Sequence, residues 1–475
     1  MMVNFLDRAI LSLSPERGLR RIKAKSAANA VMNYDAASRG RRTSGWKAPA
    51  TAADASAFGN RPRLRNLSRD MIRNRPYAAR AQSVVTGNVV GTGIMPSVEM
   101  DPENQASSEA ALKFLKSHLM TTAIDAAGVN TLPGLQTQVM NAVFSDGEVL
   151  ARQRLRKRSF NSKLPLLFQV QLMECDYLDE TKQSHGRNEV VEGIEYGPTG
   201  RIEAYHLYDR HPGDVQFWRG RQLASSRVPA GQILHVRRSD RPGQMRGAPW
   251  LAPVMMALGE LSDYQEAEIL KQRMAALLAF FRENEDAIPD AAKTQISELA
   301  PGAVIDLEPG QKITPTSPPS KDGYSDFMRQ GVFTIAMGLG ITGESLSGDL
   351  RGVNFSSGRM GRMEMDRFIQ VWQQQLVIDQ FCAGIGEWSR DVWRMQGQSE
   401  PNLPPVPASI GWTAPRRPLI DPSKEISASV AEIDAGLTSR SRKQRELGYD
   451  PETIAAERAE DALRDGKTPT FETED

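Results

Sequence analysis

The side chains best suited to chemistry do not follow a catalytic or metal-binding spacing. The five histidines contain no H-E-x-x-H zinc motif. They are His118, His185, His206, His211 and His235. The glycine-rich segment 338–361 holds no lysine, so it is not built to contact the γ-phosphate of a nucleotide. The sequence contains no P-loop and no G-x-S-x-G motif, and no G-x-G-x-x-G lies between a predicted strand and a predicted helix. We therefore expect no catalytic residue, no metal and no cofactor.

The individual histidines and cysteines have structural interpretations. His211 precedes a Pro-Gly-Asp turn sequence and is interpreted as a turn residue. His206 and His235 fall in predicted strands, where a hydrogen-bonded structural histidine is the default. Cys175 and Cys382 are far apart and fit neither a disulfide nor a metal-pair pattern. This cysteine usage favours a reducing compartment.

Length and composition predict a globular protein of several domains. The chain has 475 residues, of which 40% are hydrophobic and 25% are charged. It has no apolar run of roughly 18 residues, and its N-terminus does not resemble a signal peptide, so we expect no membrane association. The net charge is +1, but residues 1–80 hold 17 basic and 5 acidic side chains. From residue 448 onward there are 9 acidic and 3 basic ones, which suggests different partners at the two ends, or simply solvated surface.

The longest predicted helix is the element around which the chain is organised. Residues 260–282 contain neither Gly nor Pro and consist mostly of strong helix formers. Their apolar positions recur at helical spacing, and the helix would be roughly 35 Å long. A turn sequence beginning at Gly243 precedes it. From this stretch alone, an ordinary core helix remains the alternative.

Helices and antiparallel strands are predicted before this long helix. Helices are expected at about 64–87, with a basic face and a kink at Pro76, at 105–121 and at 132–144. Turn signals separate the five strands that we predict. These are Glu148–Arg154, Phe168–Met173, Val190–Tyr196, Ile202–Tyr208 and Ile233–Val236. The middle third is therefore expected to be an antiparallel α+β domain.

After the long helix, the pattern predicts a hairpin, helices and a flexible segment. The hairpin pairs Ala303–Leu307 with Gln311–Ile313 around a Glu-Pro-Gly turn. A helix at 324–337, the glycine-rich segment and a helix at about 360–395 follow. Two short helices are expected near the C-terminus, at Pro422–Ala435 and Pro451–Arg464.

Taken in order, several stretches resemble the lambda-type portal proteins of tailed bacteriophages. The first four are NYDAASRGRR, RDMIRNRPYAARAQSVVTGNVVGTGI, FSDGEVLARQR and FQVQLMECDYLD. GIEYGPTGRIEAYHLYDRHPGD and RVPAGQILHVRRSDRPGQMRGAPWLAPV follow. The last are GLGITGESLSGDLRGVNFSSGRMGRMEMDRF and WTAPRRPLIDPSKEISASVAEIDAGLTSRS. Together they span nearly the whole chain, and their succession is more specific than any one of them.

The resemblance implies an α+β portal fold with named segments. An N-terminal arm and wing would occupy 1–240, a stem helix 241–282, a clip 283–322 and a second stem helix 323–338. The glycine-rich residues 339–358 would be a tunnel loop, 359–395 a tunnel helix, and 396–475 a C-terminal wing, crown and tail. A rod, an inserted hairpin, a return helix, a loop and a second long helix fit a stem and channel.

The resemblance also implies a ring, usually dodecameric, at one capsid vertex of the virion, with a tunnel for double-stranded DNA. The chain would assemble in the host cytoplasm, and its partners would be further copies of itself, DNA without sequence specificity, the terminase large subunit, a head-completion adaptor, and capsid and scaffold proteins. A capsid-processing hydrolase and a non-ring DNA-binding adaptor are the alternatives.

Site residues follow from the same resemblance. Residues expected to face DNA phosphates are Arg351, Asn354, Arg359 and Arg362, although these arginines could instead pair with acids of neighbouring subunits. Docking residues at the clip would be Asp306, Glu308 and Lys312. Subunit contacts would come from Leu270, Met274, Ala275 and Leu278. The basic face of helix 64–87 is expected to meet neighbouring subunits or packaged DNA.

Overall fold

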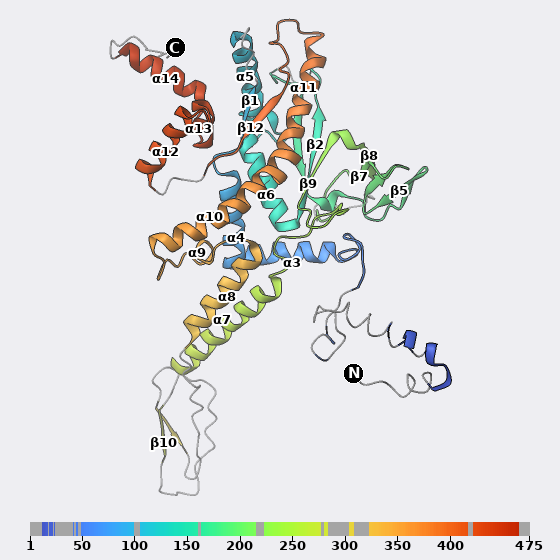
Figure 1. The fold of residues 1–475 in the computed structure, drawn as a ribbon, viewed down its shortest axis with the longest axis vertical. Coiled ribbons are helices and arrows are strands. Elements are labelled where there is room, and N and C mark those ends of the chain that lie inside the picture. Colours follow the sequence, from blue (N-terminus) through green and yellow to red (C-terminus); the bar gives the residue numbers. More distant parts are fainter. Residues whose placement is uncertain are drawn as a thin grey trace. The chain divides into compact units, whose positions relative to one another are not determined.

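The computed structural model describes two units of the chain, Met1–Ser56 and Ala57–Asp475. The described residues are 12–17, 19–21, 23, 41, 44, 45, 49–98, 105–159, 163–214, 223–276, 280–283, 304–307, 323–416 and 421–464. In the first unit, residues on both sides of Ser14 are helical. The remaining paragraphs concern the second unit (Figure 1).

The predicted helix at 64–87 is two helices joined at Arg75. The first, α3, spans Arg61–Asn74, and the second, α4, spans Pro76–Val90. Arg75 is extended, because the proline ring that follows disfavours helical geometry at the preceding residue. Pro76 itself occupies the first helical turn of α4, where a missing N–H costs nothing. The predicted break at this proline is therefore confirmed.

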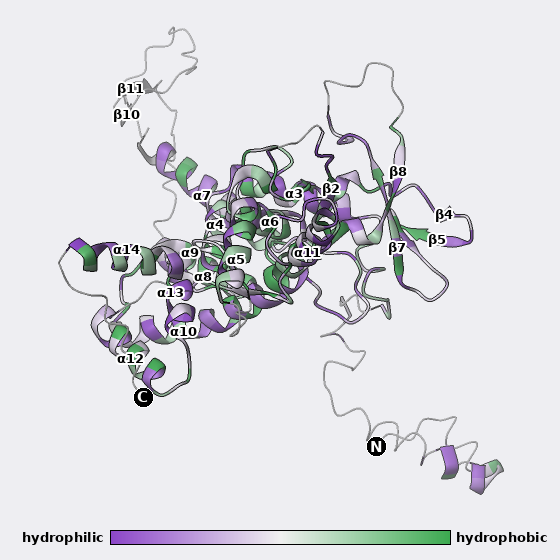
Figure 2. Cartoon of the chain, turned by 90° about the horizontal axis from the view of Figure 1, so that it is seen from above, coloured by the Kyte–Doolittle hydropathy of each residue, from purple (hydrophilic) through white to green (hydrophobic). Residues whose placement is uncertain are grey.

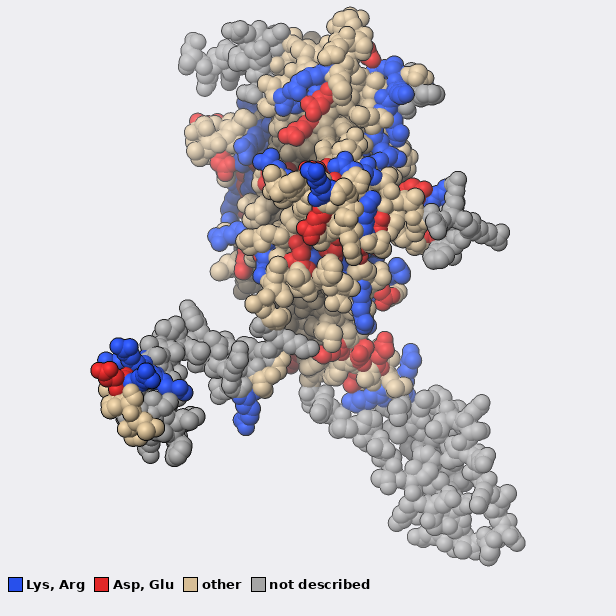
Figure 3. Space-filling view, turned by 90° about the vertical axis from the view of Figure 1, so that its right-hand side faces the viewer, with Lys and Arg blue, Asp and Glu red and all other residues tan. Residues whose placement is uncertain are grey.

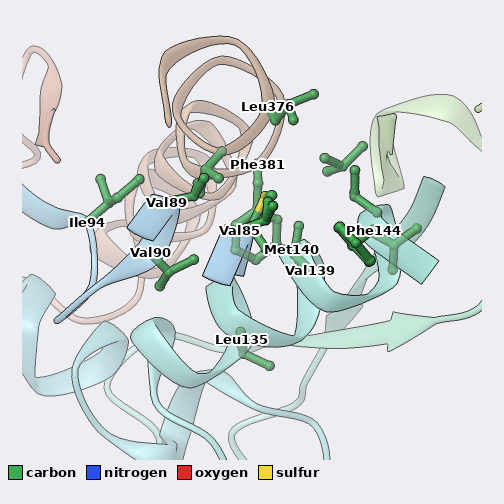
Figure 4. Packing of buried hydrophobic residues seen from close by; sticks show 14 of the residues in the cluster. Val85, Val89, Val90, Ile94, Leu135, Val139, Met140, Phe144, Leu376 and Phe381 are labelled. Atoms are coloured by element: carbon green, nitrogen blue, oxygen red, sulfur yellow. The ribbon is translucent and has the colours of Figure 1, made fainter. Parts of the chain in front are cut away.

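The main hydrophobic core forms where α4 packs against α6 (Leu132–Asp146) and a long C-terminal helix. Figure 4 shows Val85 and Val89 of α4, Val139 and Met140 of α6, and Phe381 directed toward one another. All five side chains are fully buried. α5 (Gln105–Leu119) and the 3-10 turn η2 (Thr122–Ile124) complete this region.

Two antiparallel sheets form the middle of the chain, as predicted. The first has the order β3-β2-β9 and the second β4-β5-β6-β7-β8. The strands are β2 (Glu148–Leu155), β3 (Phe168–Met173), β4 (Ser184–His185), β5 (Asn188–Val191), β6 (Ile194–Tyr196), β7 (Ile202–Tyr208), β8 (Ser225–Pro229) and β9 (Ile233–Arg237). The single strand predicted at 190–196 is two strands, because the chain turns at Glu192 and Gly193, both with positive φ. The 3-10 turns η3 (Cys175–Tyr177) and η5 (Ala230–Gln232) connect strands.

The long helix α7 spans Met255–Ala276 and lies beside α8 (Tyr324–Leu339) (Figure 1). The two helices approach closely at small residues. A Cβ on Gly331 would lie 2.7 Å from a methyl carbon of Leu261, and one on Gly338 would lie 2.4 Å from a methyl carbon of Val254. Farther along the pair, the rings of Tyr264 and Phe327 are 4.6 Å apart. The two helices therefore pack against each other at these positions.

The predicted ends of the long helix were wrong. Residues 251–254 form turns before α7, and the helix ends at Ala276 rather than at residue 282. Phe280–Glu283 forms the strand β10, which pairs in parallel with β11 (Val304–Leu307). Two adjacent aromatic residues, Phe280 and Phe281, favour an extended strand. The other half of the predicted hairpin, 311–313, lies outside the described residues.

The glycine-rich segment contains the short helix α9 (Gly343–Ser347). It leads into a continuous helical run composed of α10 (Phe355–Trp372), the π-helical segment η6 (Gln373–Cys382) and α11 (Ala383–Gly397). The predicted helix at 360–395 is confirmed and extends a few residues farther at each end. One face of this run is buried in the main core. The buried side chains are Met365, Ile369, Leu376, Val377, Phe381, Ile385, Trp388, Val392 and Trp393.

Glutamine amides join distant backbone segments to this core. The Gln380 amide accepts from Arg237 N at 2.9 Å and donates to Arg237 O at 3.1 Å. Gln136 pairs in the same way with both backbone groups of Ile94. Because an amide side chain offers a donor and an acceptor side by side, it satisfies both the backbone N–H and the backbone C=O of one residue.

The C-terminal part returns to the N-terminal part through a strand pair. β12 (Ile410–Thr413) pairs antiparallel with β1 (Met95–Val98). Three helices follow, α12 (Pro422–Asp434), α13 (Arg440–Glu446) and α14 (Pro451–Arg464). Of these, α13 was not predicted. Lys116 of α5 contacts Asp450 at 2.8 Å and Glu452 at 3.1 Å, which ties the start of α14 to α5.

The helices carry both hydrophilic and hydrophobic residues (Figure 2). Among the described residues, no helix combines the length and the apolar character needed to cross a membrane.

Candidate functional site

The loop before α10 holds the first two predicted DNA-facing residues. Arg351 is 84% exposed, and its guanidinium donates to both carboxylate oxygens of Asp349, at 2.9 and 3.0 Å. Asn354 is the N-cap of α10, where its side-chain oxygen accepts from Ser357 N at 2.8 Å. Ser357 Oγ in turn accepts from Asn354 N, which completes a capping box. Asn354 therefore begins the helix, and Arg351 is the more available of the two.

The other two predicted DNA-facing residues lie on α10 itself. Arg359 is exposed and Arg362 is half-buried. Both line a cavity of about 420 Å³ between α10 and α12, together with Asp366 and Glu425. In the single chain they face the C-terminal helices, and they lie on a different element from Arg351. The structure thus brings Arg359 and Arg362 together, but not all four residues in one cluster.

The predicted docking and subunit-contact residues are only partly described. Leu270 is on α7 and is 58% exposed, which agrees with a contact surface. Met274 and Ala275 also belong to α7, and Asp306 belongs to β11, but the surroundings of their side chains are not described. Leu278, Glu308 and Lys312 lie outside the described residues.

Large apolar side chains are exposed on the long helices. Those of α7 and α8 occur at both ends of these helices, and those of α10 fall on the side away from its buried residues. They are Met256, Ile269 and Leu270 of α7, Tyr324, Phe327 and Met337 of α8, and Met360, Met363, Phe368 and Val371 of α10. Exposed apolar surface, where it is extensive, marks protein contact sites.

A buried ionic network, which sequence reasoning missed, centres on Glu148. Arg246 Nε donates to both carboxylate oxygens of Glu148, at 2.9 and 3.1 Å, and His235 Nε2 lies 3.0 Å from the second oxygen. The backbone N–H of Gly247 also donates to that oxygen, at 2.8 Å. Glu148 and Arg246 are each 1% exposed. The network joins β2, β9 and the turn before α7.

The arginines of α3 extend this network. Arg61 Nε donates to both oxygens of Glu192, each at 3.1 Å. Arg65 lies 3.3 Å from Asp176, and Arg69 donates to Asp176 at 2.6 Å. The expectation that this basic face meets DNA or other subunits is therefore wrong for Arg65 and Arg69, because acids of the same chain bind them. On the face of the molecule in Figure 3, basic and acidic side chains are interspersed rather than gathered into one basic patch.

The ionisation of the network follows from its geometry. Burial alone would raise the pKa of Glu148, but the charge of Arg246 and the hydrogen bonds from His235 and Arg246 hold that pKa well below its usual range. Burial lowers the pKa of Arg246, and the nearby Glu148 charge more than reverses this, so the guanidinium stays protonated. A carboxylate and a guanidinium, both charged and buried, thus neutralise each other.

Three groups of potential metal ligands lie close together among the described residues. They are Glu148, Cys175 and His235; His185, Glu195 and His206; and Glu174, Asp176 and His211. In each group a carboxylate is already bonded to an arginine. Because a guanidinium on the same carboxylate repels a metal cation, these groups are better described as ion-pair networks. The predicted structural roles of His206 and His235 are confirmed, since each contacts a buried glutamate, at 2.9 and 3.0 Å. His211 Nδ1 accepts from Gly213 N, as expected of a turn residue.

The burial of His118 predicts that the folded subunit loses stability in mild acid. The ring is fully buried on α5, 4.9 Å from the ring of Phe168, and burial lowers its pKa to about 3. Below the ordinary histidine pKa of about 6.5, the unfolded chain binds a proton that the folded chain does not, so stability falls with pH. From pH 7.5 to pH 5 the contribution of His118 is about 2 kcal/mol.

Urea unfolding of the wild type and His118→Leu at these two pH values measures this contribution. The variant should lose about 2 kcal/mol less than the wild type on acidification. The control is Val139→Ala, which changes a buried side chain without removing a titratable group and should lower stability equally at both pH values. Equal acid losses in the wild type and in both variants would contradict the prediction.

Comparison with known proteins gives a consistent result. The family model for phage portal proteins of the lambda family matches residues 39–373. A probable portal protein of Halomonas phage phiHAP-1 is 26% identical, covering 89% of this chain and 85% of that protein. The portal protein of Escherichia phage N15 is 23% identical over 88% of this chain and 87% of its own length. Portal protein B of Escherichia phage lambda is 22% identical over 88% of this chain and 86% of its own length.

Solved structures of gene transfer agent particles are also similar. A chain from the neck of an empty particle matches with a TM-score of 0.44 and 14% identity, covering 81% of this chain and 94% of that one. A chain from the native virion matches with a TM-score of 0.42 and 13% identity, covering 82% and 94%.

Proposed function

The chain belongs to the lambda family of phage portal proteins, and from that premise we propose that its subunits close into a ring, usually of about twelve, around a channel for double-stranded DNA. The family match favours this interpretation over a capsid-processing hydrolase or a non-ring DNA-binding adaptor. In this role the ring would sit at the portal vertex of the virion, after assembly in the host cytoplasm.

The exposed apolar surface of α7, α8 and α10 carries the ring proposal. A cyclic ring needs head-to-tail contacts, in which each subunit presents two different surfaces. Long helices with apolar side chains exposed in the single chain supply such surfaces, because burying those side chains between subunits favours association. Leu270 on α7 and the exposed α10 residues Met360, Met363, Phe368 and Val371 are the contacts that we propose.

The proposed DNA contacts are sparse. A conduit must let DNA slide, and each phosphate contact adds salt-dependent affinity that would hold the DNA in place. Arg351, on an exposed loop bounded by Gly348 and Gly352 with positive φ, can reach a phosphate by exchanging its bond to Asp349. We keep Arg351, Arg359 and Arg362 as the proposed DNA-facing residues. The Asn354 side chain caps α10, and a contact with DNA would compete with its hydrogen bond to Ser357 N.

The partners proposed for packaging are the terminase large subunit, then a head-completion adaptor, with capsid and scaffold proteins around the ring. Docking of the first two is proposed at the region of Asp306, Glu308 and Lys312, on the basis of the family resemblance.

Leu270→Glu is expected to prevent ring closure while leaving the subunit folded. Leu270 is 58% exposed, so the glutamate is solvated in the monomer, but it would be buried unpaired in a ring. Native mass spectrometry and negative-stain top views measure the assembly. The control is Gln272→Glu, which adds the same charge about 200° around α7, on the opposite face.

We expect the wild type and Gln272→Glu to give rings with a central hole, and Leu270→Glu to give monomers with an unchanged circular dichroism spectrum. Closed rings of Leu270→Glu would rule out this contact. A defined wild-type dimer that binds DNA would rule out the ring itself.

A further inference from the structure

A cavity of about 660 Å³ lies between η6, β12 and α13. Four of its lining side chains are cationic, and among the described residues that line it the one carboxylate is Glu446. The cations are Arg416, Arg442, Lys443 and Arg445. The lining therefore carries a clear excess of positive charge, unlike the interspersed charges elsewhere on the surface.

The backbone around the cavity holds these cations in place. Ser439 caps α13 by accepting from Arg442 N at 3.2 Å. Arg416 N donates to the carbonyl of Glu446, which fixes α13 to the end of β12. Arg445 Nε donates to Thr413 Oγ1 at 3.0 Å, across the same junction. The positive charges thus converge from two secondary-structure elements that are bonded to each other.

Acids within the chain neutralise the cations only in part. Glu446 is shared between Arg442 at 3.5 Å and Lys443 at 3.3 Å, and Glu432 also binds Lys443, at 2.6 Å. Arg416 lies 3.8 Å from Glu425, and its charge also acts on Glu432. Burial, and then the charge of Arg442, lower the pKa of Arg445, as expected where like charges are brought together. An oxyanion in the cavity would relieve this repulsion.

Further arginines lie beyond this cavity. The smaller cavity that Arg359 and Arg362 line shares Gln370, Gln373 and Arg416 with it, and its lining also includes the acids Asp366 and Glu425. From Arg359 to the shared glutamines, α10 rises roughly 20 Å. Arginines spaced over that length suit a repeated anion better than one small ion, because phosphates of one DNA strand recur about every 3.4 Å along the axis.

We propose that the cavity lined by Arg416, Arg442, Lys443 and Arg445 binds backbone phosphates of double-stranded DNA without reading its sequence. Guanidinium groups match the geometry of phosphate oxygens, and no sequence readout is needed for contacts to the backbone. The inference rests on the proposed function, because DNA reaches this cavity only if it passes through the ring. It adds a contact site in the C-terminal segment, away from the loop of Arg351.

The test compares the wild-type chain with Arg416→Gln/Arg442→Gln, using fluorescence anisotropy of a labelled duplex over a range of salt concentrations. These two arginines are chosen because their ion pairs within the chain are long, so the fold should tolerate their loss. The matched control is Arg394→Gln/Arg464→Gln, which removes two exposed cations that each pair with an aspartate three residues earlier.

Losing two phosphate contacts should reduce the slope of log affinity against log salt by about 1.8 and weaken binding near 0.1 M salt roughly tenfold or more. The control should keep the wild-type slope. Native mass spectrometry of the same variant should still show rings, which separates failure of this site from failure of the proposed function.

Three outcomes would overturn the proposal. One is an unchanged slope in Arg416→Gln/Arg442→Gln. A second is that the variant loses binding of inorganic phosphate, added alone as the probe, but keeps its duplex affinity, which would mark a free-anion site. A third is that the variant loses binding of a polyglutamate peptide while duplex binding is unchanged, which would assign the cavity to an acidic protein segment.

Discussion

Glu148→Ala is expected to destabilise the subunit by about 3–5 kcal/mol, the usual cost of removing one partner of a buried ion pair. Arg246 is 1% exposed and would keep its charge without the carboxylate that neutralises it. His235 and the N–H of Gly247 would lose their acceptor as well. Urea unfolding measures the loss, which would be a large fraction of the roughly 5–15 kcal/mol by which an ordinary folded protein is stable.

A double-mutant cycle separates the ion pair from simple loss of side-chain volume. Glu148→Gln, Arg246→Gln and the double variant should be strongly non-additive, because either single change leaves a charge buried and the double change leaves none of this pair. The matched surface control is Asp391→Asn, whose partner Arg394 is half exposed, and it should cost less than about 1 kcal/mol. Additive losses in the cycle would show that Glu148 and Arg246 are not coupled.

Gly147→Ala and Gly247→Ala are expected to disrupt the close contact between the turn that joins α6 to β2 and the segment that precedes α7. A Cβ on Gly247 would lie 2.1 Å from the carbonyl oxygen of Gly147, and one on Gly147 would lie 2.3 Å from the backbone carbon of Ala248. Because both obstacles are backbone atoms, no side-chain rotation relieves them, and each change should cost on the order of 3 kcal/mol or more.

Two other glycines provide matched controls for these substitutions. Gly147 also has a φ of +89°, and Gly200 shares a positive φ, +75°, but has open space around it. Gly200→Ala should therefore show only the cost of the left-handed conformation, about 1–2 kcal/mol. Gly231 has open space and no positive φ, so Gly231→Ala controls for Gly247→Ala and should be nearly neutral. If the members of each pair lose equal stability by thermal unfolding, steric exclusion is not the cause.

Strands and helices were predicted well where the residues within the element, or directly beside it, determine its type and its ends. Phe168–Met173 and Ile202–Tyr208 begin and end as predicted, since turn residues flank a β-branched and aromatic run. The break at Pro76 was also predictable from local sequence, because a proline disfavours helical geometry at the residue before it. The strand β12 was not predicted, because its partner β1 is more than 300 residues away and the run itself is short.

The candidate site was only partly predictable. In sequence, Arg65 and Arg69 look like an exposed basic face, because their partners Asp146 and Asp176 are more than 75 residues away. One signal was available: Glu148 directly precedes three apolar residues, Val149, Leu150 and Ala151, which favours a buried and therefore paired carboxylate. Asn354 is followed three residues later by Ser357, a pairing that indicates a helix cap as readily as a phosphate ligand.

The pairing of β1 with β12 determines when the subunit can finish folding during translation. Val98 faces Ile410, so β1 leaves the ribosome long before its partner has been made. At about 5–20 residues per second, the delay is roughly 15–60 s. During that interval the edge of β1 is open to mispairing with other nascent chains. Only a nearly full-length polypeptide can close the core, so prematurely terminated chains would be left exposed to proteolysis.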